Sequence, residues 1–215
     1  MEGLILMDIS NITVNAQNSI RIDAGKIIYI DPFQIDGEPG DADYIFLTHD
    51  HYDHYSPDDI NKVLQNETVF IVPEAMDLRL RKNTNAGKNL PVRPDNKYET
   101  EDFTFETVPA YNLLKPFHPK KAGWVGYILD IGGTRIYIAG DTDATKEVKN
   151  VRCDIAMIPI GGTYTMNFKE AARLINEIRP EYAIPTHYGT LVGKESDGEG
   201  FRDLVDDGIN VVLKL

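Results

Sequence analysis

The chain has 215 residues, of which 42% are hydrophobic and 26% are charged, and its formal net charge is −12. This composition is typical of globular proteins with a substantial core. The negative charge disfavours nucleic acid and anionic membranes as partners, because it repels polyanions. No apolar run approaches the roughly 20 residues that span a bilayer, and the first residues lack the basic region of a signal peptide. We therefore expect no membrane segment.

The single cysteine, Cys153, excludes a disulfide within the chain and favours a reducing, cytoplasmic environment. It lies in an apolar run, so we interpret it as a buried thiol and not as a nucleophile. No linker or repeat interrupts the sequence, and residues 1–215 are expected to form a single domain. The oligomeric state is not indicated.

Hydrophobic periodicity and turn residues predict short strands, mostly in hairpins, that alternate with helices. The predicted elements are strands at 12–14, 19–23, 26–30 and 44–47, a helix at 57–65, a strand at 68–72, a helix at 73–80, a surface loop at 83–96, strands at 103–108, 125–131, 134–139 and 154–158, a helix at 167–178, a strand at 182–184, a helix at 197–206 and a strand at 209–213. Hairpins followed by β–α units occur twice, which predicts an α/β protein with two mixed sheets between helices. Trp124 and Tyr127 flank a hairpin strand and are expected in the core.

Three of the five histidines and two aspartates lie within residues 48–54, directly after the predicted strand at 44–47. The cluster therefore lies at the carboxyl end of a strand, where open α/β architectures place ligands. Imidazoles interleaved with carboxylates have no packing value and would repel or stay unpaired without a cation between them. The cluster predicts a metal site.

The remaining histidines follow other elements of the chain. His187 comes after the strand at 182–184, and His118 lies in residues 109–123, an irregular stretch whose length favours a functional role. His118 could equally be a hydrogen-bonded structural residue, and Asp141 a turn residue after its strand. Together with Asp53 and Asp141, the five histidines give seven potential ligands from four loops. Seven ligands are too many for one ion but suit two ions if one carboxylate is shared.

The segment His49-Asp50-His51-Tyr52-Asp53-His54 resembles the HxHxDH signature of the metallo-β-lactamase-fold hydrolases. Three later residues also match this family: the single histidine His118, Asp141 at the end of a strand, and the late histidine His187. Asp31 fits an aspartate that follows an early strand in this family. The resemblance covers nearly the whole chain. The segments 140–143, 159–162 and 185–188 are most similar to the branch that contains L-ascorbate-6-phosphate lactonase. The resemblance implies a four-layer αββα sandwich.

The resemblance also implies a dinuclear metal site. Carried over by position, the ligands of the first metal are His49, His51 and His118, those of the second are Asp53, His54 and His187, and Asp141 bridges the two. The histidine of this branch usually lies near residues 109–112, where this chain has none, so the remaining histidine, His118, is placed in that role. The ions expected are zinc, with manganese as the alternative.

The function implied is hydrolysis of a small-molecule ester, lactone or phosphoester by a metal-bridging hydroxide. Asp53 is expected to orient that hydroxide and to pass a proton to the leaving group. A phosphorylated lactone or a phosphodiester-like molecule is the substrate class favoured by the resemblance. Three residues are predicted to contact the substrate, and Lys115 would suit an anionic one: Asn112, Lys115 and Tyr164.

A second class of function stays open on the same fold. The protein could bind metal without hydrolysing a substrate, as a di-iron redox protein or as a structural or binding domain. The ligand set argues against di-iron, because redox relatives often substitute acids for histidines at positions such as His51 and His54. Metal content and colour distinguish the two classes.

Overall fold

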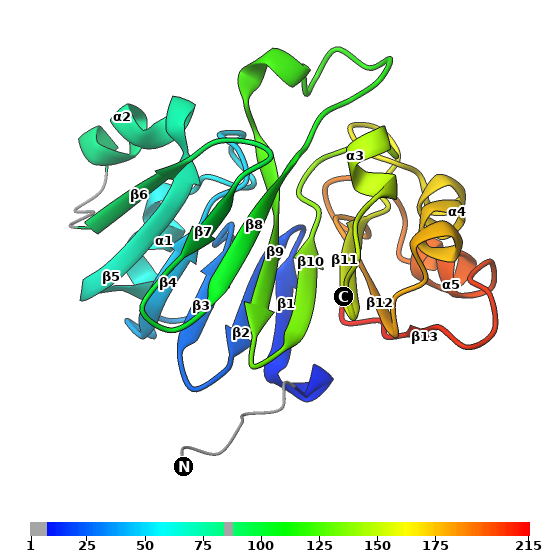
Figure 1. Cartoon of the computed structure of the whole chain (residues 1–215), viewed down its shortest axis with the longest axis horizontal. Helices are drawn as coiled ribbons and strands as arrows, with labels where there is room; N and C mark the ends of the chain where they lie inside the picture. The colour runs from blue at the N-terminus through cyan, green and yellow to red at the C-terminus, as the bar shows by residue number, and fades with distance from the viewer. Residues whose placement is uncertain (1–7, 84–87) are drawn as a thin grey trace.

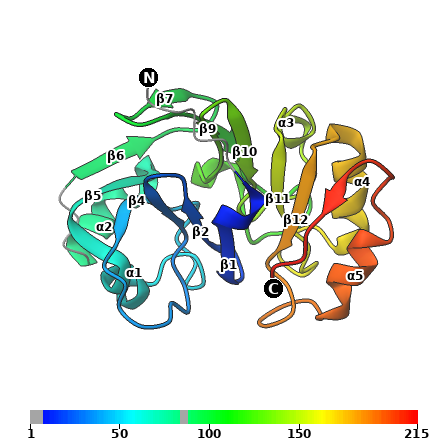
Figure 2. The same ribbon diagram turned by 90° about the horizontal axis from the view of Figure 1, so that it is seen from below.

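Two β-sheets face each other and helices cover the outer face of each sheet (Figures 1 and 2). This computed structural model describes residues 8–83 and 88–215. Each sheet contains both parallel and antiparallel pairs, as the hairpins and β–α units of the sequence predict. The predicted αββα arrangement of two mixed sheets is confirmed.

The first sheet contains six strands in chain order, which are β1 (Ile12–Ala16), β2 (Ser19–Asp23), β3 (Ile27–Ile30), β4 (Ala42–Phe46), β5 (Leu64–Pro73) and β6 (Lys88–Val92). The first three strands pair antiparallel, and β3 to β6 pair parallel. The two helices that follow β4 and β5 are α1 (Pro57–Val63) and α2 (Glu74–Asn83). They pack their apolar side chains against the outer face of this sheet.

The second sheet runs in the order β13 (Asn210–Val211), β12 (Tyr182–Thr186), β11 (Ile155–Pro159), β10 (Thr134–Ile138), β9 (Val125–Ile131), β8 (Thr104–Pro109) and β7 (Lys97–Glu99). Its helices are α3 (Lys146–Lys149), α4 (Phe168–Ile178) and α5 (Ser196–Arg202), and short 3-10 turns lie at η1 (Ile9–Asn11) and η2 (Lys120–Ala122). Strands β10 to β13 pair parallel. Parallel pairing puts the loops that follow these strands at one edge of the sheet.

The core between the sheets is built around aromatic rings from both. Phe46 of β4 meets Phe105 of β8 and Tyr127 of β9 edge to face, with ring centroids 5.3 and 4.9 Å apart. All three side chains are buried. The Tyr127 hydroxyl, which must find an acceptor when buried, donates to the carbonyl of Leu47 at 2.6 Å. The expected core position of Tyr127 is confirmed.

Helix α4 forms for the reasons visible in its sequence. Asn167 accepts hydrogen bonds from the backbone N–H groups of Lys169 and Glu170, and the Glu170 carboxylate accepts from the Asn167 N–H. This capping box satisfies donors that the first turn leaves without partners. Four residues at helical spacing then bury one face against the second sheet: Ala171, Leu174, Ile175 and Ile178.

Two short strands and one short α-helix were not predicted. Strand β6 falls in the segment expected to be a surface loop, of which residues 84–87 lie outside the described residues. Its Pro91 obscures the strand pattern, but proline is tolerated there because β6 is an edge strand. Strand β7 and helix α3, with three and four residues, are too short for a periodicity to be visible.

The ends of several predicted elements also move. The helix predicted to residue 65 ends at Val63, the strand expected at 68–72 extends over Leu64–Pro73, and the last strand shortens to Asn210–Val211. Within the described part of the chain, none of the helices is long and apolar enough to cross a membrane.

Candidate metal centre

The seven predicted ligands meet at the edge of the sandwich where strands β4, β8, β10 and β12 end. The loop after β4 supplies four of them, and the loop between β8 and β9, which projects from the sheets in Figure 1, supplies His118. Asp141 follows β10, and His187 follows β12 with a positive φ of 57°. The sequence placed each ligand after a strand or in this loop, and the fold brings all seven together.

The ligand atoms form two groups of three that lie side by side. The first group is His49, His51 and His118, and the second is Asp53, His54 and His187; within each group the ligand atoms lie within 4.8 Å of one another. A third group of the same size, His49, His54 and Asp141, joins them.

Asp141 presents one carboxylate oxygen to each group. Its Oδ2 lies 3.3 Å from Nε2 of His118. Its Oδ1 lies 3.3 Å from Nε2 of His54 and 3.4 Å from Nε2 of His187. The side chain is buried, so its orientation is fixed by packing. A carboxylate between two sets of imidazoles is the arrangement that a shared ligand of two ions requires.

Several buried polar atoms in the centre have no hydrogen-bond partner within the described part of the chain. They include Nε2 of His118 and Oδ1 of Asp141. Nitrogen atoms of neighbouring rings also approach each other closely: Nε2 of His49 lies 3.1 Å from Nδ1 of His51, and Nε2 of His187 lies 3.2 Å from Nε2 of His54. Buried polar atoms are normally paired, so this convergence fits cations that the side chains would coordinate.

Burial and charge set the protonation of the centre. Burial lowers the pKa of His49 well below its usual value, aided by the neighbouring His54. Burial opposes the ionisation of Asp141, but the charges of His187 and His54 hold its pKa well below the usual range. A neutral imidazole beside an ionised carboxylate is the donor set that a divalent ion needs.

His54 shows that the centre attracts positive charge. Burial disfavours its charged form, but the carboxylates of Asp141 and Asp31 raise its pKa well above the usual value. The aspartates therefore stabilise a cation at this position. Divalent ions would compensate the negative charge of the same carboxylates. The electrostatics of the centre therefore also favour bound metal.

Asp31 contacts the His54 ring on the side that faces away from the centre. Its Oδ2 lies 2.7 Å from Nδ1 of His54, so Nε2 is the nitrogen that faces the centre. The same carboxylate accepts hydrogen bonds from the backbone N–H and the hydroxyl of Thr48 and from the amide of Asn18. Outer contacts of this kind fix ring orientation at metal sites. Asp31 itself has a positive φ of 45°.

Asn112, which the sequence predicts to contact the substrate, contacts His118. Its Oδ1 accepts from the backbone N–H of His118 at 3.1 Å and lies 3.0 Å from the ring Nδ1. Its Nδ2 donates to the carbonyl of Tyr164 at 2.8 Å and to Asp143 at 3.3 Å. The Asn112 side chain is buried, and both ends of its amide are engaged within the protein.

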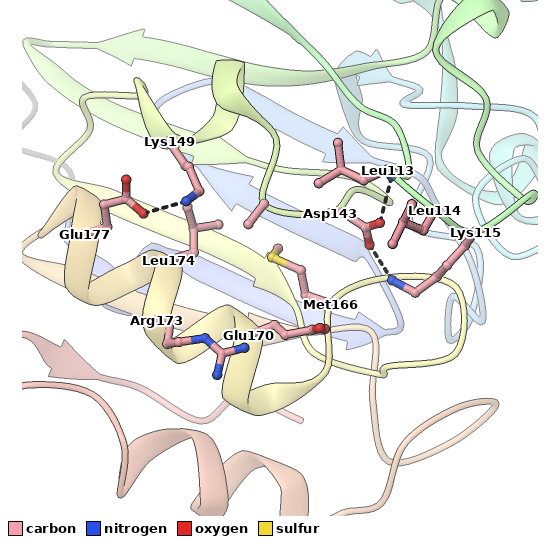
Figure 3. Close-up of a pocket in the computed structure, with 11 residues that line it drawn as sticks. Leu113, Leu114, Lys115, Asp143, Lys149, Met166, Glu170, Arg173, Leu174 and Glu177 are labelled. Atoms are coloured by element: carbon pink, nitrogen blue, oxygen red, sulfur yellow. Dashed lines mark hydrogen bonds and ion pairs between the residues drawn. The ribbon is translucent and has the colours of Figure 1, made fainter.

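Lys115 forms an ion pair with the carboxylate of Asp143. Asp143 also accepts from the backbone N–H of Leu113. The pair lies in the wall of a pocket of about 480 Å³ between the loop after β8 and helix α4 (Figure 3). None of the seven predicted ligands lines this pocket. It adjoins the metal centre through Asp143 and Asn112.

Trp124 is a site residue that the sequence analysis misplaced. Its ring centroid lies 5.1, 5.0 and 5.5 Å from the rings of His49, His51 and His118. It is partly exposed, whereas a core position was expected. The sequence did contain a sign of this position: Trp124 directly precedes β9, at the sheet edge where the ligand-bearing strands end. The indole forms an apolar wall beside the first group of ligands.

Comparisons with known proteins identify the family of the chain. Residues 11–187 match the family model of the beta-lactamase superfamily domain. The chain is 30% identical over 221 residues to a UPF0173 metal-dependent hydrolase of Staphylococcus carnosus, covering 94% of this chain and 96% of the relative.

Solved structures show the same fold. A protein of Parabacteroides distasonis, described as a candidate metal-dependent hydrolase, is 30% identical, with a TM-score of 0.80 over 95% of this chain and 92% of the other. CmlA, a diiron β-hydroxylase of Streptomyces venezuelae, shares the fold at 12% identity, with a TM-score of 0.74 over 95% of this chain and 52% of the other. The chain belongs to the metallo-β-lactamase superfamily and, within it, to the UPF0173 metal-dependent hydrolases.

Proposed function

We propose that the protein is a dinuclear hydrolase of small-molecule esters, lactones or phosphoesters. The first divalent ion would be held by His49, His51 and His118, and the second by Asp53, His54 and His187. Asp141 would be shared. The observation that supports two ions is the orientation of Asp141, with one oxygen toward each group of ligands. Zinc suits a set of imidazoles and carboxylates, and manganese is the alternative.

When bound, two such ions act as Lewis acids on the substrate oxygen and lower the pKa of water to about 7. The chain's own residues keep the ring nitrogens aimed at the centre: Asp31 fixes His54, and Asn112 fixes His118. Both supports are buried, so the ligand geometry is set before a substrate arrives.

Asp53 is the proposed proton carrier. Burial opposes its ionisation, but the hydrogen bond from His187 and the charge of His54 lower its pKa below the usual value. Its Oδ2 lies 3.2 Å from Nε2 of His187. Its side chain is 12% exposed, more than those of the deeply buried His54 and Asp141. An ionised carboxylate at the open side of the centre can orient the attacking water and pass its proton to the leaving group.

Metal analysis is the direct test of this proposal. Purified protein should contain about two zinc or manganese ions per chain, be colourless, and hydrolyse at least one member of a panel of esters, lactones and phosphodiesters. Chelation should abolish that activity, and the added metal should restore it. One ion per chain would contradict the dinuclear site.

The second candidate is a metal protein that does not hydrolyse, and the shared fold of the diiron hydroxylase CmlA is the observation in its favour. Iron with a visible absorption band, or full metal occupancy without activity across the panel, would support it. For the hydrolase, we propose a cytoplasmic location and a small-molecule partner, based on the single cysteine and the acidic charge.

A further inference from the structure

Three exposed aromatic side chains lie on loops that carry or support the predicted ligands. Tyr52, Phe117 and Tyr164 are 68%, 42% and 38% exposed, and we call them the aromatic rim. They come from three separate loops. Tyr52 lies between two predicted ligands, Phe117 precedes His118, and the carbonyl of Tyr164 accepts a hydrogen bond from Asn112, which holds His118. Exposed aromatic side chains gathered at one place indicate a binding surface.

Two members of the aromatic rim are in contact, and the third contacts a neighbouring aromatic ring. The rings of Phe117 and Tyr164 meet edge to face, with centroids 4.7 Å apart. Tyr52 meets Phe33 in the same way at 6.3 Å.

The aromatic rim lies at the open side of the centre. Of the seven ligands, His51 is half-buried and Asp53 is slightly exposed, whereas the other five are more deeply buried. His51 and Asp53 are the immediate neighbours of Tyr52 in the chain. Tyr52 therefore lies beside the two most solvent-accessible ligands.

Two lysines of the loop between β8 and β9 are already paired with carboxylates of the protein. Lys115, the residue predicted to attract one, is paired with Asp143. Lys120 of the same loop is paired with Glu147 at 2.7 Å and lies over the ring of Tyr111. The chain as a whole carries a formal charge of −12, which slows the approach of anions.

We propose that the substrate is an uncharged ester or lactone with an aromatic or similarly apolar group that packs on Tyr52, Phe117 and Tyr164. This inference rests on the proposed hydrolase function and narrows its substrate class away from phosphorylated molecules. In the reaction the acyl C–O bond breaks, the oxygen of water joins the acyl carbon, and one proton of the water passes to the alcohol oxygen. The products are a carboxylate, a released proton and an alcohol.

The first experiment compares lactones that share one ring and differ in one substituent: phenyl, methyl or phosphate. With the metal-loaded protein we expect kcat/KM for the phenyl lactone to exceed that of the methyl and phosphate lactones by about tenfold or more, since a contacting aromatic ring contributes on this scale. A preference for the phosphate lactone, or equal rates for phenyl and methyl, would overturn the proposal.

Variants locate the effect in the aromatic rim. Tyr52→Ala and Phe117→Ala should each lower kcat/KM for the phenyl lactone by about fivefold to tenfold, mainly through KM, and lower it for the methyl lactone by a clearly smaller factor. Phe117→Leu should recover part of the loss. The matched control is Leu204→Ala. Leu204 lies beyond helix α5, and its apolar side chain is 46% exposed, close to the 42% of Phe117. Equal losses on both lactones would contradict a role for the aromatic rim in recognition.

Binding separates this inference from the reaction itself. Trp124 is the only tryptophan and lies about 5 Å from three ligand rings, so its fluorescence reports on ligands at the centre. Phenylacetate should bind at least about fivefold more tightly than acetate, and Tyr52→Ala should remove the difference. If phenylacetate binds more tightly in this way but no lactone or ester is hydrolysed, the proposed hydrolase function is wrong and the aromatic rim is still supported as a binding surface. Equal binding of phenylacetate and acetate overturns the aromatic rim.

Discussion

Oδ1 of Asn112 faces both the backbone N–H of His118, at 3.1 Å, and the ring Nδ1 of the same residue, at 3.0 Å. The backbone N–H can only donate, so it requires the amide oxygen on that side. The oxygen in turn requires a proton on Nδ1, which leaves Nε2 of His118 free to bind metal. A residue that the sequence suggested for substrate contact thus determines the tautomer of a ligand.

Asn112→Ala is expected to weaken metal binding at the first site by about tenfold to a hundredfold, because the ring of His118 loses its orientation. Titration of the metal-free protein with zinc, followed by Trp124 fluorescence, measures this. Asn112→Asp keeps an acceptor for Nδ1 but places a carboxylate oxygen against the Tyr164 carbonyl and Asp143, so it should recover only part of the affinity. If Asn112→Ala bound zinc like the wild type, the proposed role would be wrong.

Asp141→Asn should reduce the metal content from about two ions per chain to one or fewer, since one oxygen of the carboxylate becomes an amide nitrogen that cannot bind metal. Metal analysis after exhaustive dialysis measures the content. Asp36→Asn, which makes the same change at an exposed position, should keep two ions. Two tightly held ions in Asp141→Asn would refute a shared ligand.

Asp53→Ala is expected to lower kcat by at least about a hundredfold, because a positioned proton carrier contributes on that scale. Folding should be preserved, as judged by circular dichroism, and at least one metal should remain. The control Asp58→Ala removes an exposed aspartate at the start of α1 and should leave kcat unchanged. Turnover near the wild-type rate in Asp53→Ala would discard its assigned role.

Tyr44 gives a pH dependence of stability away from the metal centre. Burial and the hydrogen bond to Asp102 at 2.6 Å raise the pKa of Tyr44 to about 12. Below the unfolded pKa of about 10 the hydroxyl is protonated in both states, so the stabilisation is fully present. As the pH rises from about 10 toward 12, the unfolded chain loses this proton first and the folded state loses stability.

Tyr44→Phe removes this titration. Between pH 9 and 11, the free energy of unfolding should fall by about 1 kcal/mol more in the wild type than in the variant. Urea unfolding at both pH values measures this difference, and the constant cost of the lost hydrogen bond cancels in it. Equal slopes in the two proteins would show that the hydroxyl titrates normally in the folded state.

The sequence alone predicted most of the fold and, with little ambiguity, six of the seven side chains that converge at the candidate metal centre. The histidine cluster at 49–54 is a local pattern whose spacing is independent of packing. His187 and Asp141 follow strands that their β-branched residues reveal, and strand ends of one sheet share an edge. The Gly132-Gly133 turn, with φ of 59° and 86°, suits the tight hairpin between β9 and β10. These features depend on neighbours in the chain.

Only the tertiary structure decided that His118 joins the cluster, that Asn112 supports it and that Trp124 lines the centre. His118 lies 64 positions after His54 in a loop without periodicity. Its location depends on how the two sheets pack and on where one buried amide finds its partners. The bridging orientation of Asp141 has the same origin, because it is set by side chains from four loops. Local patterns encode strands and helices, whereas the geometry of the centre arises from contacts between distant residues.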